Sequence, residues 1–116
     1  MSEVTIYHNP RCSKSRQTLA LLEDRGISAT VVHYLETPPD ENTLKQLLSA
    51  LNLAPRELMR RKEAVYADLN LADPGLSDDE LIAAMVANPI LIERPIVTHG
   101  QRCAIGRPPE NVLDIL

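Results

Sequence analysis

The chain has 116 residues, which is enough for one domain with a buried core. With 44% hydrophobic and 24% charged residues, the composition is typical of a globular protein and excludes a disordered tail. A formal net charge of −4, and three tyrosines without Phe or Trp, argue against a protein that binds nucleic acid by charge or by base stacking. We therefore expect an aliphatic core and no nucleic-acid partner.

The N-terminus and the cysteines indicate where the protein works. Met1-Ser2-Glu3 is acidic and leads directly into a β-rich run, so no signal peptide is expected. No apolar stretch approaches the roughly eighteen residues that a membrane span needs. Cys12 and Cys103 lie far apart, and a disulfide framework is not expected without a secretory signal. These features predict a cytoplasmic protein that does not enter a membrane.

The first third of the chain predicts a strand, a helix and a second strand. Val4–His8 is a short β-rich run. Ser13–Arg25 contains good helix formers, and Gly26 suits the position just after a helix. Thr30–Tyr34 is a second β-rich run. This order predicts two parallel strands joined by a crossover helix.

The middle of the chain, about residues 40–90, predicts a block of helices. One helix has leucines at helical spacing: Leu44, Leu47, Leu48 and Leu51. Pro55–Lys62 and Glu63–Leu69 are predicted as two shorter helical pieces. Ser77–Glu80 has the pattern of a capping box, and it opens a further helix that ends at Asn88.

The last part of the chain predicts a hairpin and a final helix. Pro95–Thr98 and Arg102–Ile105 are β-rich runs around a turn that contains Gly100. Pro108–Leu116 is predicted as a short helix. The whole order is that of a thioredoxin-like α/β fold. We expect a single domain over residues 1–116, with a mixed four-stranded sheet, flanking helices and a central helical insertion.

Cys12 is the first candidate for chemistry. It follows the first predicted strand and begins the first helix, where free amide groups and the helix dipole favour a thiolate. Arg11, Lys14 and Arg16 add positive charge nearby. The pattern predicts a nucleophilic thiolate in a loop that attracts anions. The alternative is a small buried apolar residue, which cysteine often is.

Other thiol and metal sites fit the sequence less well. The segment Cys12-Ser13-Lys14-Ser15 is not Cys-x-x-Cys, so a local dithiol is excluded, although Ser15 can donate to the thiolate. Thr18 stands where a tyrosine-phosphatase loop has its arginine. His8 and Cys12 lack the further ligands of a zinc site, so no metal is predicted. Cys103 is predicted to be buried rather than to resolve Cys12.

Three arginines are candidates for holding a tetrahedral oxyanion, because planar guanidinium groups suit that geometry. Arg60 lies in the helical block, whereas Arg94 and Arg107 each precede a proline and flank the predicted hairpin. Ser15 is a fourth candidate. The alternative for each arginine is an ordinary surface position, which is far more common.

The order and spacing of several motifs resemble the glutaredoxin-linked arsenate reductase family, in a short branch of it. The resemblance runs from the first strand to the last helix, and it implies a thioredoxin-like fold with a helical insertion. It rests on these segments: His8-Asn9-Pro10-Arg11-Cys12, Ser15-Arg16, His33-Tyr34-Leu35-Glu36, Pro38-Pro39, Arg60, Ile92-Glu93-Arg94-Pro95-Ile96-Val97 and Arg107-Pro108.

The resemblance also implies a chemistry. Cys12 matches the cysteine that attacks arsenate to form a covalent thiol–arsenate adduct, and His8 matches a histidine that tunes it. Arg60, Arg94 and Arg107 match the arginines that hold the oxyanion. Glutathione is the implied cosubstrate, glutaredoxin the implied partner and arsenite the product. No bound cofactor or metal is implied.

Two other functions remain open on the sequence. One is a general glutathione-dependent thiol oxidoreductase, which needs the thiolate but not the oxyanion site. The other is a transcription-regulating partner of RNA polymerase on the same fold. Such regulators mostly carry Cys-x-x-Cys, which Ser15 removes here.

Overall fold

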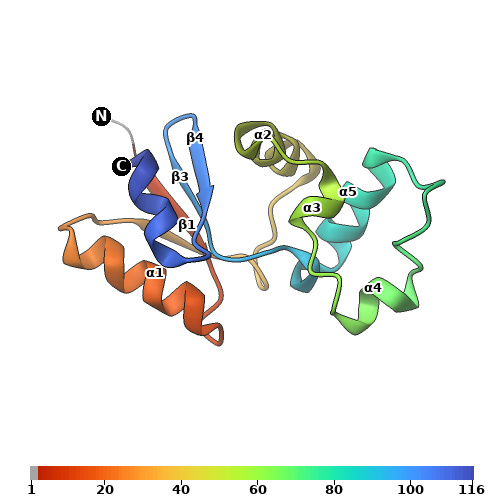
Figure 1. Cartoon of the computed structure of the whole chain (residues 1–116), viewed down its shortest axis with the longest axis horizontal. Coiled ribbons are helices and arrows are strands. Elements are labelled where there is room, and N and C mark those ends of the chain that lie inside the picture. Colours follow the sequence, from red (N-terminus) through yellow and green to blue (C-terminus); the bar gives the residue numbers. More distant parts are fainter. Residues whose placement is uncertain (1–2) are drawn as a thin grey trace. The chain divides into compact units, whose positions relative to one another are not determined.

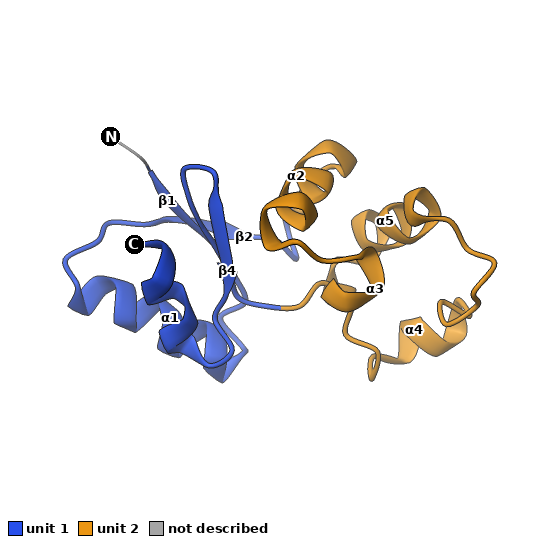
Figure 2. Ribbon diagram, turned by 45° about the horizontal axis from the view of Figure 1, so that its top comes forward, with its two compact units in different colours: residues 1–37, 94–116 blue, residues 38–93 orange. Residues whose placement is uncertain are grey.

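The computed structural model describes residues 3–116, and Met1 and Ser2 of the predicted leaderless N-terminus lie outside the described residues. The chain divides into two compact units, which Figure 2 distinguishes by colour. Unit 1 comprises residues 1–37 and 94–116, and unit 2 comprises residues 38–93. The helical insertion predicted at about residues 40–90 falls in unit 2.

Unit 1 contains a mixed four-stranded sheet with the strand order β2-β1-β3-β4. β1 pairs with β2 in parallel and with β3 in antiparallel orientation, and β3 and β4 form a hairpin (Figure 1). The strands are β1 (Val4–His8), β2 (Thr30–His33), β3 (Ile96–His99) and β4 (Arg102–Ile105). The predicted parallel pair, the hairpin and the mixed sheet are therefore confirmed.

Two helices lie side by side against one face of this sheet: α1 (Ser13–Asp24) and η2 (Pro109–Ile115), a 3-10 helix (Figure 1). Alternate residues of a strand point to the same face, and Val4 and Ile6 of β1 both point to the helices. The core between the two layers is aliphatic, as predicted. Its buried members are Val4, Ile6, Leu22, Val97, Val112 and Ile115.

The regular elements of unit 2 are helices. Its elements are α2 (Glu41–Leu51), α3 (Pro55–Leu58), α4 (Ala64–Asp68), α5 (Asp78–Ala87) and the 3-10 helix η1 (Pro89–Leu91). Asp40 caps α2 by accepting the Thr43 N–H at 2.7 Å, and Ser77 and Glu80 form the predicted capping box of α5. Within residues 3–116, every helix is too short or too polar to span a bilayer.

One predicted helix is shorter than expected. Pro55–Lys62 was predicted as helical, but α3 ends at Leu58 and Met59 is extended, with φ −85° and ψ 144°. Met59 forms an antiparallel bridge with Ile92, and the Leu58 carbonyl accepts the Glu93 N–H at 2.8 Å. This pairing across the unit takes the backbone groups that a longer helix would use, and it buries the Met59 side chain.

Gly106 occupies a crowded position in unit 1. Its N–H donates to the Pro95 carbonyl at 2.9 Å. The Thr18 hydroxyl, anchored on the Lys14 carbonyl at 2.8 Å, lies against it. A Cβ atom on Gly106 would overlap Thr18 Oγ1 and would lie 2.8 Å from Pro95 Cγ. Glycine therefore allows α1 to approach the two loops that flank the hairpin.

Replacing Gly106 by alanine is expected to lower the free energy of unfolding by about 1–3 kcal/mol, because neighbouring groups must shift to admit the methyl group. Urea denaturation measures the change. Gly75→Ala is the control, since the nearest atom to its added Cβ would be Asp73 Oδ1 at 3.3 Å, in an exposed turn. Equal losses in the two variants would contradict this account.

Candidate active site

The loop between β1 and α1 presents Cys12. The Cys12 N–H donates to the Asn9 carbonyl at 3.0 Å, which closes a turn, and Asn9 Oδ1 accepts the Arg11 N–H at 3.0 Å. Cys12 is the N-cap residue of α1, and its side chain is 9% exposed. The predicted position of the thiol is thus confirmed. The role of Asn9 in shaping the loop was missed, although Asn before Pro is a recognised turn signal.

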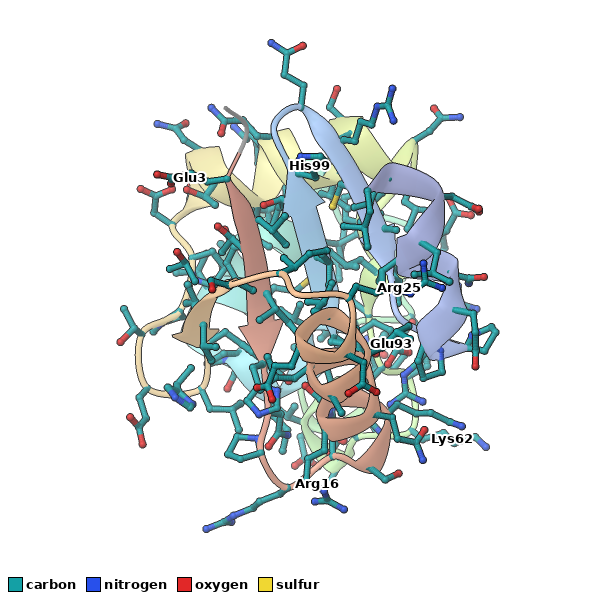
Figure 3. The ribbon with its side chains drawn as sticks, turned by 90° about the vertical axis from the view of Figure 1, so that its left-hand side faces the viewer. Glu3, Arg16, Arg25, Lys62, Glu93 and His99 are labelled. Carbon is teal, nitrogen blue, oxygen red and sulfur yellow. The ribbon has the colours of Figure 1, made fainter. Side chains whose placement is uncertain are left out.

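This loop lies at the end of the sheet where β1 finishes. Figure 3 shows Arg16, in the first turns of α1, at the opposite end of the unit from Glu3 and His99. The Arg16 Nη1 group donates to the Pro10 carbonyl at 2.9 Å and ties the loop to the helix. Sites of α/β proteins commonly lie at the carboxyl ends of parallel strands, and β1 and β2 both end here.

Arg107 is in contact with the thiol. Its Nη2 group donates to Cys12 Sγ at 3.4 Å, and its Nε group donates to the Arg94 carbonyl at 2.7 Å. Arg94 precedes β3 and Arg107 follows β4, so the hairpin brings both residues to one place. A guanidinium is a strong hydrogen-bond donor to anionic groups, so this contact places such a donor at the sulfur. The structure thus brings together Cys12, Arg94 and Arg107.

His8 and Ser15 form a second contact in the same loop. His8 Nδ1 lies 2.7 Å from Ser15 Oγ, and the Asn9 N–H donates to that oxygen at 3.0 Å. Both side chains are buried, at 5% and 0% exposure. The Ser15 hydroxyl therefore links the end of β1 to α1. Its predicted contact with the thiolate or an oxyanion stays a prediction.

His8 is neutral at neutral pH. Burial lowers its pKa below the ordinary value of 6.5, and the positive charges of His33 and Arg16 lower it further. The two histidines end neighbouring strands, and their rings meet edge to face with centroids 6.0 Å apart. Because folding lowers this pKa, His8 costs stability as the pH falls through 6.5, where the unfolded chain takes up the proton first.

An NMR titration of the imidazole is expected to give a midpoint for His8 below 6.5. The variant His33→Gln removes one of the neighbouring cations, so the His8 midpoint should rise toward the ordinary value. A His8 midpoint at or above 6.5 in the wild type would contradict the lowered pKa. If the His8 midpoint is the same in His33→Gln, His33 does not contribute to the lowered pKa of His8.

Arg60 belongs to unit 2, whereas the other candidate residues belong to unit 1. Its N–H donates to the Leu91 carbonyl at 2.7 Å, and its Nε group lies 3.6 Å from a Glu63 carboxylate oxygen. Its Nη1 atom is buried and has no hydrogen-bond partner within residues 3–116. A buried donor without an acceptor is costly, so this atom suits an anionic ligand. The predicted role of Arg60 stays a prediction.

Cys103 lies on β4, opposite Thr98, and it is half-buried rather than buried as predicted, because β4 is the edge strand of the sheet. Burial raises the pKa of its thiol to about 12, so this cysteine is protonated at neutral pH. Both cysteines are free thiols. Across residues 3–116, no three His, Cys, Asp or Glu side chains are grouped so that they could hold a metal ion.

A mixed four-stranded sheet, with a cysteine at the start of α1 and an arginine donating to its sulfur, defines a thioredoxin-like fold with its first-helix thiol in contact with a cation. Comparison with known proteins then assigns the family. Residues 7–115 match the ArsC family, and the chain belongs to it.

Individual relatives match over nearly their whole length. The uncharacterized protein YfgD of Escherichia coli K12 is 58% identical over 115 residues, which cover 98% of this chain and 97% of that protein. An arsenate reductase of Neisseria meningitidis is 50% identical and matches over 100% of both chains. The structure of an arsenate reductase from Vibrio cholerae superposes with a TM-score of 0.97, at 56% identity, over 99% of this chain and 98% of that one.

Proposed function

We propose that this protein is an arsenate reductase, an oxidoreductase in which Cys12 is the nucleophile. The observation that carries the proposal is the 3.4 Å hydrogen bond from Arg107 Nη2 to Cys12 Sγ, at the start of α1. This contact supports the proposal because it brings a thiol and a guanidinium group within hydrogen-bonding distance. Membership of the ArsC family, and relatives that are named arsenate reductases, support arsenate as that oxyanion.

In the first step, the Cys12 thiolate attacks the arsenic atom of arsenate. A sulfur–arsenic bond forms, and one arsenate oxygen leaves as water after taking up protons. The guanidinium groups of Arg94 and Arg107 offer hydrogen bonds to the remaining oxygens, where negative charge accumulates. The redox state of arsenic does not change in this step.

Reduction follows with thiols from outside the chain, for which we propose glutathione and glutaredoxin. Glutathione displaces a second arsenate oxygen as water and forms its own sulfur–arsenic bond. A glutaredoxin thiolate then attacks the glutathione sulfur, and the electron pair of the broken bond stays on arsenic. Arsenic is reduced from the pentavalent to the trivalent state while a disulfide forms. Water finally releases arsenite from Cys12.

His8 and Arg60 complete the proposal. His8 is neutral and therefore does not act on the Cys12 thiol as a charge. Instead, its hydrogen bond with Ser15 holds the loop that carries Cys12. The Nη1 atom of Arg60 is buried and has no hydrogen-bond partner among residues 3–116, and we propose that it donates to an anion. Two free cysteines also agree with a reducing compartment, and we propose the cytoplasm.

The test is NADPH oxidation that depends on arsenate, coupled through glutathione, glutaredoxin and glutathione reductase. Turnover that requires all the thiol components supports the proposal. Activity on a glutathione mixed disulfide, with none on arsenate, would replace it by a general thiol oxidoreductase. Absence of both activities, together with capture of RNA polymerase, would favour the transcription-regulating alternative.

A further inference from the structure

A cleft of about 250 Å³ opens where β1 and β2 end. Residues 8–11 form one wall, and His33, Leu35 and Glu36 form the other. The parallel register pairs His8 with His33, so the carboxyl ends of β1 and β2 both lie at this cleft. The volume is smaller than the roughly 300–1,000 Å³ of pockets that hold a drug-sized ligand, so it suits a fragment about the size of one amino acid.

The cleft contains charges of both signs. The Arg11 guanidinium and the Glu36 carboxylate both line it, and neither has an ion-pair partner among the described residues 3–116. The imidazoles of His8 and His33 are the other titratable groups in the cleft, and His8 is neutral. A ligand with one carboxylate and one ammonium group can pair with both open charges. The lining therefore selects an α-amino-acid head over a simple anion.

The cleft and the thiol share one loop. Asn9, Pro10 and Arg11 line the cleft, and Arg11 immediately precedes Cys12, which closes the turn by donating its N–H to the Asn9 carbonyl. A ligand that occupies the cleft and also reaches Cys12 must carry its amino-acid head several bonds away from its reacting atom. Leu35 lines the same cleft and is 39% exposed, so it offers an apolar surface to a connecting methylene chain.

We propose that this cleft binds the γ-glutamyl end of glutathione, with Arg11 pairing with its carboxylate and Glu36 with its ammonium group. That end combines the two charges with methylene groups, and it is separated from the glutathione sulfur by a side-chain amide. The inference deepens the proposed function, since it rests on glutathione being the thiol that attacks the arsenic atom held by Cys12.

A thiol–disulfide exchange at Cys12 tests the proposal without arsenate. In a Cys103→Ser background, Cys12 is converted to a mixed disulfide with thionitrobenzoate. An attacking thiolate then forms a new disulfide with the Cys12 sulfur and expels the coloured thionitrobenzoate anion, whose release gives the rate. The thiols compared are glutathione, glutaryl-cysteinylglycine and β-mercaptoethanol. The glutaryl compound lacks only the ammonium group, and β-mercaptoethanol lacks both charges.

We expect wild-type Cys12 to react about fivefold faster with glutathione than with the glutaryl compound, the upper range for an exposed ion pair. Glu36→Gln should remove that preference. Arg11→Gln should slow both carboxylate-bearing thiols about fivefold relative to β-mercaptoethanol. Glu23→Gln and Arg25→Gln, at the far end of α1, are the matched charge controls and should keep the wild-type ratios.

Three results would overturn the inference: no preference for glutathione in the wild type, the same preference in Glu36→Gln, or an Arg11→Gln effect that is equal for all three thiols. The experiment separates failure of this inference from failure of the proposed function. If only the proposed function is wrong, the wild-type protein does not reduce arsenate, but its exchange rates still differ among the three thiols.

Discussion

Replacing Cys12 by serine is expected to abolish arsenate reduction, because a hydroxyl group is a far weaker nucleophile than a thiolate. Arsenate-dependent NADPH oxidation measures the loss. Cys103→Ser is the matched control and should retain most of the activity. Its thiol is half-buried, with a pKa raised to about 12, so it is neither ionised nor well exposed to attack the adduct.

Loss of turnover in Cys103→Ser, with the fold intact by circular dichroism, would contradict the single-thiol account. It would point to a disulfide between the two cysteines during the cycle. Trapping of a thiol–arsenic adduct on Cys12 in the Cys103→Ser protein would instead agree with the proposed order of steps.

The second large effect is expected at Arg107. Its guanidinium donates to Cys12 Sγ at 3.4 Å and is held by the Arg94 carbonyl at 2.7 Å, so it is placed to bind an oxyanion at the sulfur. A hydrogen bond to a charged group contributes about 1.5–3 kcal/mol, so Arg107→Ala should lower kcat/KM for arsenate by about ten- to a hundredfold. Arg107→Lys should recover only part of the lost kcat/KM, because an ammonium group lacks the planar, two-pronged donor geometry of a guanidinium.

Arsenate should also protect Cys12 from alkylation, and this protection should weaken in Arg107→Ala. Arg102→Ala, at the exposed first position of β4, is the matched control for removing one arginine. If Arg107→Ala matches the wild type in both turnover and protection, the oxyanion site is wrong. The alternative function, a general glutathione-dependent thiol oxidoreductase, would then be favoured.

The sequence by itself determined the elements of the fold and the position of the thiol. The β-rich run Val4–His8, the leucine spacing from Leu44 onward and the capping box at Ser77 are local patterns, and each appears in the structure as predicted. Cys12 was identified for the same reason. The end of a strand and the start of a helix are both readable from neighbouring residues, and they place the thiol at an N-cap.

Only the tertiary structure decided which side chains meet. The hydrogen bond from Arg107 to Cys12 joins residues 95 positions apart, and the contact of His8 with Ser15 depends on how α1 folds back against β1. The end of α3 at Leu58 was mispredicted because the bridge from Met59 to Ile92 is invisible to local propensity. Long-range pairing satisfies backbone and side-chain groups with partners that no short stretch of sequence contains, and it therefore overrides local preference.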